Sequence, residues 1–467
     1  MSVVLTGTGI WLWGFLLAFL IRMQSGDSRP LHIIKGISLA PITGPGLLSV
    51  AWFFALYLEC PQYLIWFFLG LSAFLFVMSR WLAKKSLDAH ETKSVSKWVV
   101  LPVLTGIIMT SISLYLDQSR PNGGSDAMAI WNYAARFLFR SGVNYPELMP
   151  LLHPSHHMDY PLFIPGAVSA QWFLLGRESW DIIQWTHAGF ILPFACLGYE
   201  IVSAVRSPRL AALTSTAMML TPALLIWNQR QYVDPHVAYA LLGGVGGLGL
   251  ALHKKNMPPS HALCTGLYLG AMPWLKNEGI PLLILATSLF VFFLYRQDQL
   301  RVRRSFLIQA CTGMLLFLGA LVVFKQSWPP TNDLLANGGT TLFDYFTNGS
   351  RWHQVLAAYG GEFNPYVPLT RTRWGASLLL IAILVFLSCI KRSWRDGSMN
   401  QMFMLFIAFA SSGWIVVYVL TPQELGWHLT TSMNRLILQL QPAFLVICVI
   451  CATSRRHSFT QKTATSS

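Results

Sequence analysis

Charged side chains are scarce in this sequence of 467 residues. Asp, Glu, Lys and Arg together make up 11% of the chain, whereas 54% of the residues are hydrophobic. A typical soluble domain carries about 25% charged residues, and no soluble core requires so large an apolar share. The scarcity of charge therefore excludes an ordinary soluble protein and indicates a chain whose surface faces lipid.

Disulfide and nucleotide-binding signatures are also missing. The chain has seven cysteines, an odd number, and six of them lie in apolar runs, so we expect no disulfide framework. Cys448 and Cys451 form a C-x-x-C, but it falls inside a predicted helix without a βαβ context, which favours a structural role. There is no P-loop and no Rossmann glycine motif beside a strand, and we expect no cofactor. The glycine-rich segment 243–249 lies within an apolar run and predicts close helix packing.

What the sequence does contain is a series of apolar runs. Each is about 20 residues long, the length that a helix needs to cross about 30 Å of hydrocarbon. The runs do not alternate, which excludes spanning strands and predicts an all-α polytopic membrane protein. The first run has no basic start and no A-x-A-like cleavage site, so we expect a retained helix. We predict about 13 transmembrane helices, over residues 3–21, 38–58, 62–79, 98–116, 182–203, 209–227, 235–252, 260–275, 280–295, 305–324, 374–390, 402–420 and 435–452.

The basic residues predict the orientation of these helices, because positively charged loops resist translocation. With the N-terminus outside and the C-terminus inside, 22 of the 33 Lys and Arg residues fall on the cytoplasmic side. This holds although the two longest loops, 117–181 and 325–373, then lie outside. Basic loops that face anionic lipid account for the net charge of +14, so we expect membrane lipids and no nucleic acid as partners. The expected location is the cell (inner) membrane, as a multi-pass protein.

Two segments of the first long loop are predicted to be helices that lie along the outer membrane surface. Segment 161–176 is apolar but short and contains two prolines, and counting it as a span would place the basic turn 206–209 outside. Segment 127–140 is amphipathic, with Ile130, Ala134, Phe137 and Leu138 on one side and Arg136 and Arg140 elsewhere.

Polar residues gather at the predicted outer helix ends. They are Asp126 and Asp159 in the first long loop, Arg230 and Asp234 in WNQRQYVDP, the hairpin residues Lys276, Asn277 and Glu278, and Arg435 at the start of the last helix. Ionisable groups at a membrane boundary are costly unless they face a cavity or have a partner. Taken singly, each also fits snorkelling or helix capping. As a set they favour a polar pocket, because the interiors of the spans hold almost no ionisable residue except Glu200, near a cytoplasmic helix end.

Such a pocket combines two kinds of chemistry. A carboxylate can take a proton from an attacking hydroxyl, while Lys and Arg offset the charge on a departing phosphate. This combination fits sugar transfer from a lipid phosphate.

The order of these motifs resembles that of bacterial membrane glycosyltransferases of the GT-C superfamily, such as protein O-mannosyltransferases and the lipid A aminoarabinose transferase. The motifs are an acidic residue before W-x-x-x-A-R/K, an H-x-x-x-x-x-D-Y-P element, a Y-x-D-P helix start, a K-N-E-G hairpin and a late R-L-x-x-x-x-x-P helix. The chain departs from the usual pattern in its SDAM sequence, where an aromatic often follows the acid, and in three additional N-terminal helices. The expected organisation is N-terminal helices of unknown role at 1–97, a catalytic module at 98–452 and a basic cytoplasmic tail at 453–467.

The resemblance implies an inverting glycosyltransferase. It would move a sugar from a polyprenyl-phosphate donor to a lipid, glycan or protein acceptor at the outer membrane face. Asp126 would act as the catalytic base, and Asp159 would assist it or orient the acceptor. Lys276 and Arg435, with Arg230 as a further candidate, would hold the donor phosphate.

Other residues of the same motifs would complete the substrate site. Asp234 and Glu278 would position the cations or bind the sugar hydroxyls. Asn277, His157 and Tyr160 are the remaining substrate-binding candidates.

Two groups of side chains keep more than one interpretation. His153, His156 and His157 with Asp159 have metal-ligand chemistry, but histidines in such a loop more often bind substrate or loop carbonyls, and we expect no metal. Trp328, Tyr345, Trp352 and Tyr366 of the second long loop fit either sugar stacking or anchoring at the interface.

Two other functions remain open at this point. A transporter or flippase would use many helices with scattered Gly and Pro, although its binding residues would lie near mid-membrane and its halves would repeat. An O-antigen ligase or polymerase-like enzyme would also carry long outer loops, but would use basic residues more than acidic ones.

Overall fold

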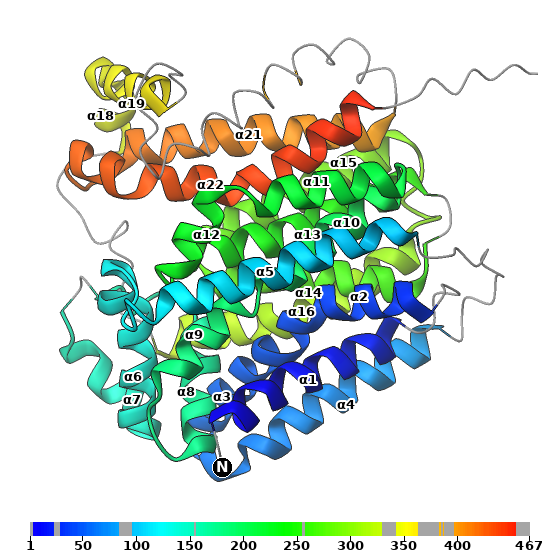
Figure 1. The fold of residues 1–467 in the computed structure, drawn as a ribbon. Helices are drawn as coiled ribbons and strands as arrows, with labels where there is room; N and C mark the ends of the chain where they lie inside the picture. The colour runs from blue at the N-terminus through cyan, green and yellow to red at the C-terminus, as the bar shows by residue number, and fades with distance from the viewer. Residues whose placement is uncertain are drawn as a thin grey trace, which may run out of the picture.

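The structure is a computed structural model that describes residues 3–22, 29–83, 96–153, 156–254, 257–328, 342–362, 383, 386 and 397–453. Within these ranges the chain forms helices and turns and no strand. Figure 1 shows long helices stacked side by side along one direction, with the short helices α6 and α7 gathered at one end of the stack. The layered helical stack agrees with the predicted all-α class.

The helices of the first half range in length from 4 to 20 residues. They are α1 (Val3–Arg22), α2 (Arg29–Pro41), α3 (Leu47–Tyr57), α4 (Leu64–Ala83), α5 (Val100–Asp117), α6 (Asn132–Ser141), α7 (Tyr145–Leu148), α8 (Phe163–Leu175), α9 (Trp180–Ala188), α10 (Ile191–Ser203), α11 (Pro208–Met219) and α12 (Pro222–Gln229). Short 3₁₀ or π turns adjoin several of them: η1 (Ile42–Gly46), η2 (Pro61–Tyr63), η3 (Lys97–Val99), η4 (Ala127–Trp131), η5 (Gly142–Asn144) and η6 (Met149–Leu151).

The described helices of the second half have 14 to 28 residues, apart from one short helix of 6 residues. They are α13 (Asp234–His253), α14 (Pro259–Leu275), α15 (Gly279–Arg296), α16 (Arg304–Ser327), α18 (Leu342–Thr347), α19 (Gly349–Glu362), α21 (Ser398–Leu420) and α22 (Leu425–Ala452). In the part of the chain that the structure describes, eight helices are long and apolar enough to cross a membrane, or nine if the bent pair α11 and α12 counts as one span. This is the architecture of an all-α, multi-pass membrane protein.

Several predicted spans are interrupted. The predicted span 209–227 is divided into α11 and α12, whose axes differ by 50°. The break precedes Pro222, which lacks an N–H and forces the residue before it out of the helical region; Thr221 is extended, with ψ 113°. The predicted span 182–203 is likewise divided, at Gly189 between α9 and α10. Of the predicted span 374–390, only residues 383 and 386 belong to the described part of the chain.

Helix α8 corrects the prediction that segment 161–176 lies along the membrane surface. All ten residues from Phe163 to Trp172 are buried. Its polar side chains have partners inside the protein, because Ser169 accepts a hydrogen bond from Trp52 (2.9 Å) and Gln171 donates one to Thr186 (3.1 Å). The segment is apolar all round because protein, not lipid headgroups, surrounds it.

The other predicted surface helix keeps its amphipathic pattern. Ala134 and Leu138 of α6 are buried, whereas Arg140 is exposed and pairs with Glu178 at 2.6 Å. The buried side of α6 contacts α8. The apolar face at 127–140 therefore covers an interior helix.

The N-terminal helices belong to the same packed body as the rest of the chain. Arg22 at the end of α1 forms a buried ion pair with Glu200 of α10 at 2.6 Å. Ser38 of α2 donates to the other oxygen of Glu200 at 2.7 Å. The Ser38 carbonyl in turn accepts hydrogen bonds from the hydroxyls of Tyr239 and Tyr268. Glu200, the acid that stood apart in the sequence, thus holds α1 and α2 against α10.

The glycines of segment 243–249 allow α13 to approach its neighbours closely. A methyl group at Gly243 would lie 2.5 Å from the ring of Tyr268, and one at Gly247 would collide with Thr265 of α14. A methyl group at Gly249 would likewise collide with the ring of Phe403 of α21. These contacts agree with the packing role predicted for the segment.

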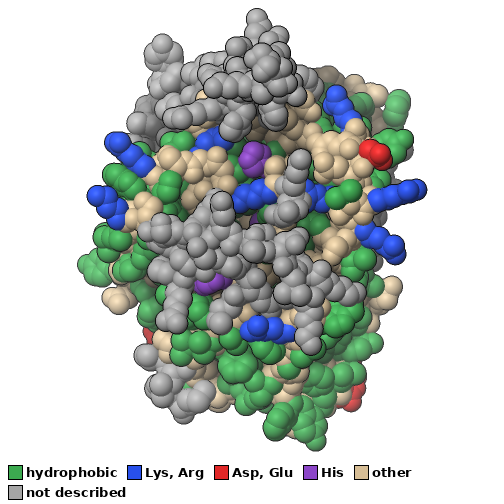
Figure 2. Space-filling model, turned by 90° about the vertical axis from the view of Figure 1, so that its right-hand side faces the viewer, with side chains coloured by type: hydrophobic (Ala, Val, Ile, Leu, Met, Phe, Trp, Pro, Cys, Tyr) green, Lys and Arg blue, Asp and Glu red, His purple; other side chains and the backbone are tan. Residues whose placement is uncertain are grey.

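The end of the stack remote from α6 and α7 is basic. Figure 2 views this end and shows blue Lys and Arg side chains around it, with few acidic ones. The exposed cations at helix ends remote from Asp126 include Arg80, Lys97, Arg209, Arg296, Arg301 and Arg304. The positive-inside rule predicts that this end faces the cytoplasm.

Cysteine labelling tests this orientation. With the native cysteines replaced, a membrane-impermeant maleimide should label Ser350→Cys in α19 on intact cells, because that residue is exposed beside the opposite end. It should label Val302→Cys, which is 75% exposed at the basic end, only after permeabilisation. The reverse pattern would place the polar residues described below on the cytoplasmic side.

Candidate functional site

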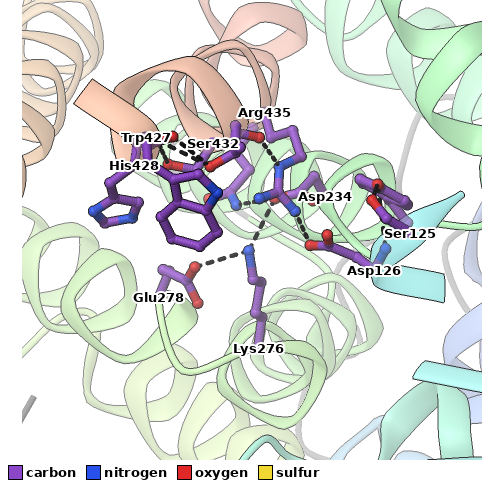
Figure 3. Close-up of polar contacts among 12 residues, drawn as sticks. Ser125, Asp126, Asp234, Lys276, Glu278, Trp427, His428, Ser432 and Arg435 are labelled. Carbon is purple, nitrogen blue, oxygen red and sulfur yellow. Dashed lines mark hydrogen bonds and ion pairs between the residues drawn. The ribbon is translucent and has the colours of Figure 1, made fainter. Parts of the chain in front are cut away.

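A network of charged side chains lies at the end of the stack where α12, α13, α14, α15 and α22 meet. Figure 3 shows that Asp126, Asp234, Lys276, Glu278 and Arg435 point toward one another. They come from four separate parts of the sequence, namely the first long loop, the start of α13, the α14–α15 hairpin and α22. The structure thus brings together residues that the sequence places more than 300 positions apart.

Lys276 lies at the centre of this network. Its side chain is only 6% exposed, and its ammonium lies 3.1 Å from Asp234 and 2.8 Å from Glu278. Burial opposes the charged form, but the two carboxylates more than offset it and raise the pKa of Lys276 above its ordinary value. Lys276 therefore stays cationic throughout the physiological pH range.

Arg435 joins α22 to the first long loop. Its guanidinium donates to the carboxylate of Asp126 through Nη1 and to the carbonyl of Thr431 through Nε at 3.0 Å. One turn further along α22, Gln439 donates to Asp234 at 2.6 Å. Because residues four apart share one face of a helix, a single face of α22 binds both Asp126 and Asp234.

Asp159 attaches the second part of the first long loop to the same hairpin. Its carboxylate accepts a hydrogen bond from Asn277 at 2.8 Å and lies 3.8 Å from the ammonium of Lys325. Lys325 also donates to the Asp159 carbonyl. Asp159 thus contacts the Lys276 hairpin through Asn277, and Asp126 of the same loop contacts Arg435.

Tyr160 is stacked between two rings beside this network. Trp131 and His157 flank it, each with a centroid separation of 5.2 Å and nearly parallel planes. Burial, followed by the nearby Glu278 carboxylate, raises the pKa of Tyr160, so its hydroxyl stays protonated. His157 itself has a positive φ of 45°.

Some predicted site residues lie apart from the network. Among the residues that the structure describes, Arg230 forms no ion pair, and its guanidinium lies over Trp227 at 4.8 Å. His156 bonds the Ala129 carbonyl at 2.7 Å, as expected for a loop histidine. The described ranges hold no group of three His, Cys, Asp or Glu side chains placed to share a metal ion.

Three of the four aromatic candidates of the second long loop lie in the described part of the chain, namely Trp328, Tyr345 and Trp352, and each contacts residues other than Arg435. Trp328 is buried against Phe53, with ring centroids 4.9 Å apart. Trp352 donates to the Phe346 carbonyl, and Tyr345 lies beneath Arg351. These contacts are packing contacts with neighbouring parts of the protein. Tyr366 lies outside the described residues.

The structure adds residues that the sequence interpretation did not include. Lys325 lies in the last turn of α16 at the same end of the stack, and its position beyond the predicted helix 305–324 was the available signal. Gln439 was signalled by its spacing of four from Arg435. Tyr232, whose ring lies 5.2 Å from the Arg435 guanidinium, is the tyrosine of the Y-x-D-P motif, and that motif was the available signal.

Comparisons of this chain with protein-family models, with curated proteins and with solved structures found no match. The site therefore has to be interpreted from its own geometry.

Proposed function

We propose that this protein is an inverting membrane glycosyltransferase. It would take a sugar from a polyprenyl-phosphate donor and pass it to a lipid, glycan or protein acceptor at the outer face of the cell membrane. The observation that carries the proposal is the direct pairing of Asp126 with Arg435, next to Lys276. A carboxylate for the acceptor and two cations for the donor phosphate thus lie in one network.

Exposure distinguishes Asp126 from the other carboxylates of the network. Its side chain is 25% exposed, compared with 1% for Asp234 and 7% for Asp159. Glu278 is similarly exposed at 23%, but it is paired with the buried Lys276. Asp126 is therefore the carboxylate that an acceptor reaches without disturbing the buried pairs, which supports its role as the base.

The proposed reaction balances without a further reagent. Asp126 takes the proton of the acceptor hydroxyl, and the hydroxyl oxygen forms a bond to the anomeric carbon of the donor sugar. The bond from that carbon to the phosphate oxygen breaks, and its electron pair leaves with the polyprenyl phosphate. Arg435 and Lys276 offset the charge on the leaving phosphate. Attack opposite to the departing phosphate inverts the anomeric configuration.

The pairing of Asp126 with Arg435 is compatible with an ordered reaction cycle. The Asp126 oxygen that accepts the hydrogen bond from Arg435 is not free to receive the proton of an acceptor hydroxyl. A phosphate, which carries at least as much charge, competes with Asp126 for Arg435. In the proposed cycle the donor therefore binds first and releases Asp126 for the acceptor.

The test is a transfer assay with the purified protein in lipid nanodiscs. Polyprenyl-phosphate sugars with a labelled sugar are supplied together with membrane lipids and glycans from a strain that lacks the protein. We expect loss of the labelled donor and the appearance of one labelled product, which mass spectrometry identifies. Movement of intact donor between leaflets without transfer would instead indicate a flippase. Joining of pre-assembled glycan chains would indicate a ligase.

A further inference from the structure

Tyr232 contacts both members of the Asp126–Arg435 pair. It lies in the turn between α12 and α13, two residues before Asp234, and is only 4% exposed. Its hydroxyl and its ring contact different partners. The two functional groups of one side chain can therefore be tested separately.

The hydroxyl of Tyr232 binds the first long loop at the base itself. It accepts a hydrogen bond from the backbone N–H of Asp126 at 3.3 Å and shares another with the hydroxyl of Ser125 at 2.9 Å. These bonds involve the backbone and the neighbouring residue. They leave the Asp126 carboxylate free to interact elsewhere.

The ring of Tyr232 lies against the cation of the pair. The guanidinium carbon of Arg435 is 5.2 Å from the ring centroid, within the range of a cation–π interaction. Trp227 packs against the same ring at 5.0 Å. The ring therefore supports Arg435 from inside the protein.

The loop backbone is shaped to fit this turn. Gly123 has a φ of 72°, and Gly124 donates its N–H to the Arg230 carbonyl at 2.9 Å. A side chain at Gly124 would lie 2.8 Å from the Tyr232 ring. The two glycines allow the backbone to run along the tyrosine, because only glycine avoids both the strain and the clash.

A second set of hydrogen bonds also holds the first long loop against this turn. The buried Gln231 accepts a hydrogen bond from Asn132 at 2.8 Å and donates one to the Pro121 carbonyl at 3.3 Å. Its own backbone adopts a positive φ of 59°. Turn 230–232 thus contacts the loop before and after Asp126.

We propose that Tyr232 is a positioning residue for the catalytic base, an inference that rests on the proposed function. When the donor phosphate binds Arg435, the Asp126 carboxylate loses its partner. The hydrogen bonds to the Tyr232 hydroxyl then keep the backbone of Asp126 in place. The ring meanwhile holds Arg435 toward the phosphate. The hydroxyl serves the chemical step, and the ring serves donor binding.

Two substitutions separate these roles. Tyr232→Phe keeps the ring, so kcat should fall about 10- to 100-fold while the KM for the donor changes by less than about twofold. Tyr232→Leu removes the ring as well, so the donor KM should also rise. Tyr239→Phe is the matched control, because it removes another buried hydroxyl of α13, which donates to the Ser38 carbonyl of α2. Its kcat and KM should match those of the wild type.

Hydrogen exchange gives a second readout that needs no activity. Amides of segment 120–132 should exchange faster in Tyr232→Phe than in the wild type, and they should not change in Tyr239→Phe. Wild-type exchange in that segment, or a kcat equal to that of the Tyr239→Phe control, would overturn the inference. If the wild-type protein transfers no sugar, the proposed function fails, and the exchange result alone decides whether Tyr232 anchors the Asp126 loop.

Discussion

Asparagine in place of Asp126 is expected to abolish sugar transfer while leaving donor binding intact. The substitution keeps the shape of the side chain but removes its ability to accept a proton, and a general base typically contributes about 10²–10⁴-fold in rate. The loss should appear in kcat. Because the uncharged amide no longer competes for Arg435, the donor should bind at least as tightly as to the wild type.

The measurements for Asp126→Asn are the transfer rate and the binding of a non-transferable phosphonate analogue of the donor. Glu147→Gln is the matched control, since Glu147 is an exposed carboxylate of the same long loop. Its rate should equal that of the wild type. Transfer at the wild-type rate by Asp126→Asn would refute Asp126 as the base. Loss of analogue binding would assign Asp126 a structural role in holding Arg435.

The helices themselves could be predicted from the sequence because a spanning helix must satisfy its own backbone hydrogen bonds over a fixed thickness of hydrocarbon. Run length therefore located α5, α13 and α15 to within a few residues. It did not show whether an apolar segment faces lipid or protein. Segment 161–176 has the same apolar character in either setting, and only the packing of α6 and α3 on α8 decides between them.

The sequence could indicate which ionisable residues belong to the candidate site, but not which of them form ion pairs with one another. The membrane restricts ionisable residues to a few helix ends, so residues such as Asp126 and Arg435 stand out in the sequence. Which carboxylate meets which cation depends on how the helices cross. Lys276 meets Asp234 because α13 and α14 lie side by side. Arg435 meets Asp126 because α22 packs against α13 and the first long loop is bonded to the turn before α13. Arg230 was a candidate for the same site from its position in the sequence, but its guanidinium lies over the ring of Trp227.

Replacing Lys276 with methionine is expected to destabilise the protein strongly, whatever its substrate. The substitution keeps the length of the side chain but leaves Asp234, which is fully buried, with Gln439 as its hydrogen-bond donor. Removing one partner of a buried ion pair costs about 3–5 kcal/mol, because the other charge stays buried without compensation. Unfolding in mixed detergent micelles measures the loss. Lys97→Met, at an exposed lysine of the basic end, should change stability by less than about 0.5 kcal/mol.

A double-variant cycle separates the structural role of Lys276 from its proposed role toward the donor. Asp234→Asn removes the buried charge and keeps an oxygen for Gln439, so adding it to Lys276→Met should restore most of the lost stability. Additive losses in the double variant would show that the Lys276–Asp234 pair is not the cause. If the double variant folds, donor binding then tests Lys276 alone. Weaker binding supports Lys276 as a phosphate ligand, whereas binding at the wild-type level would leave Arg435 as the cation that holds the donor.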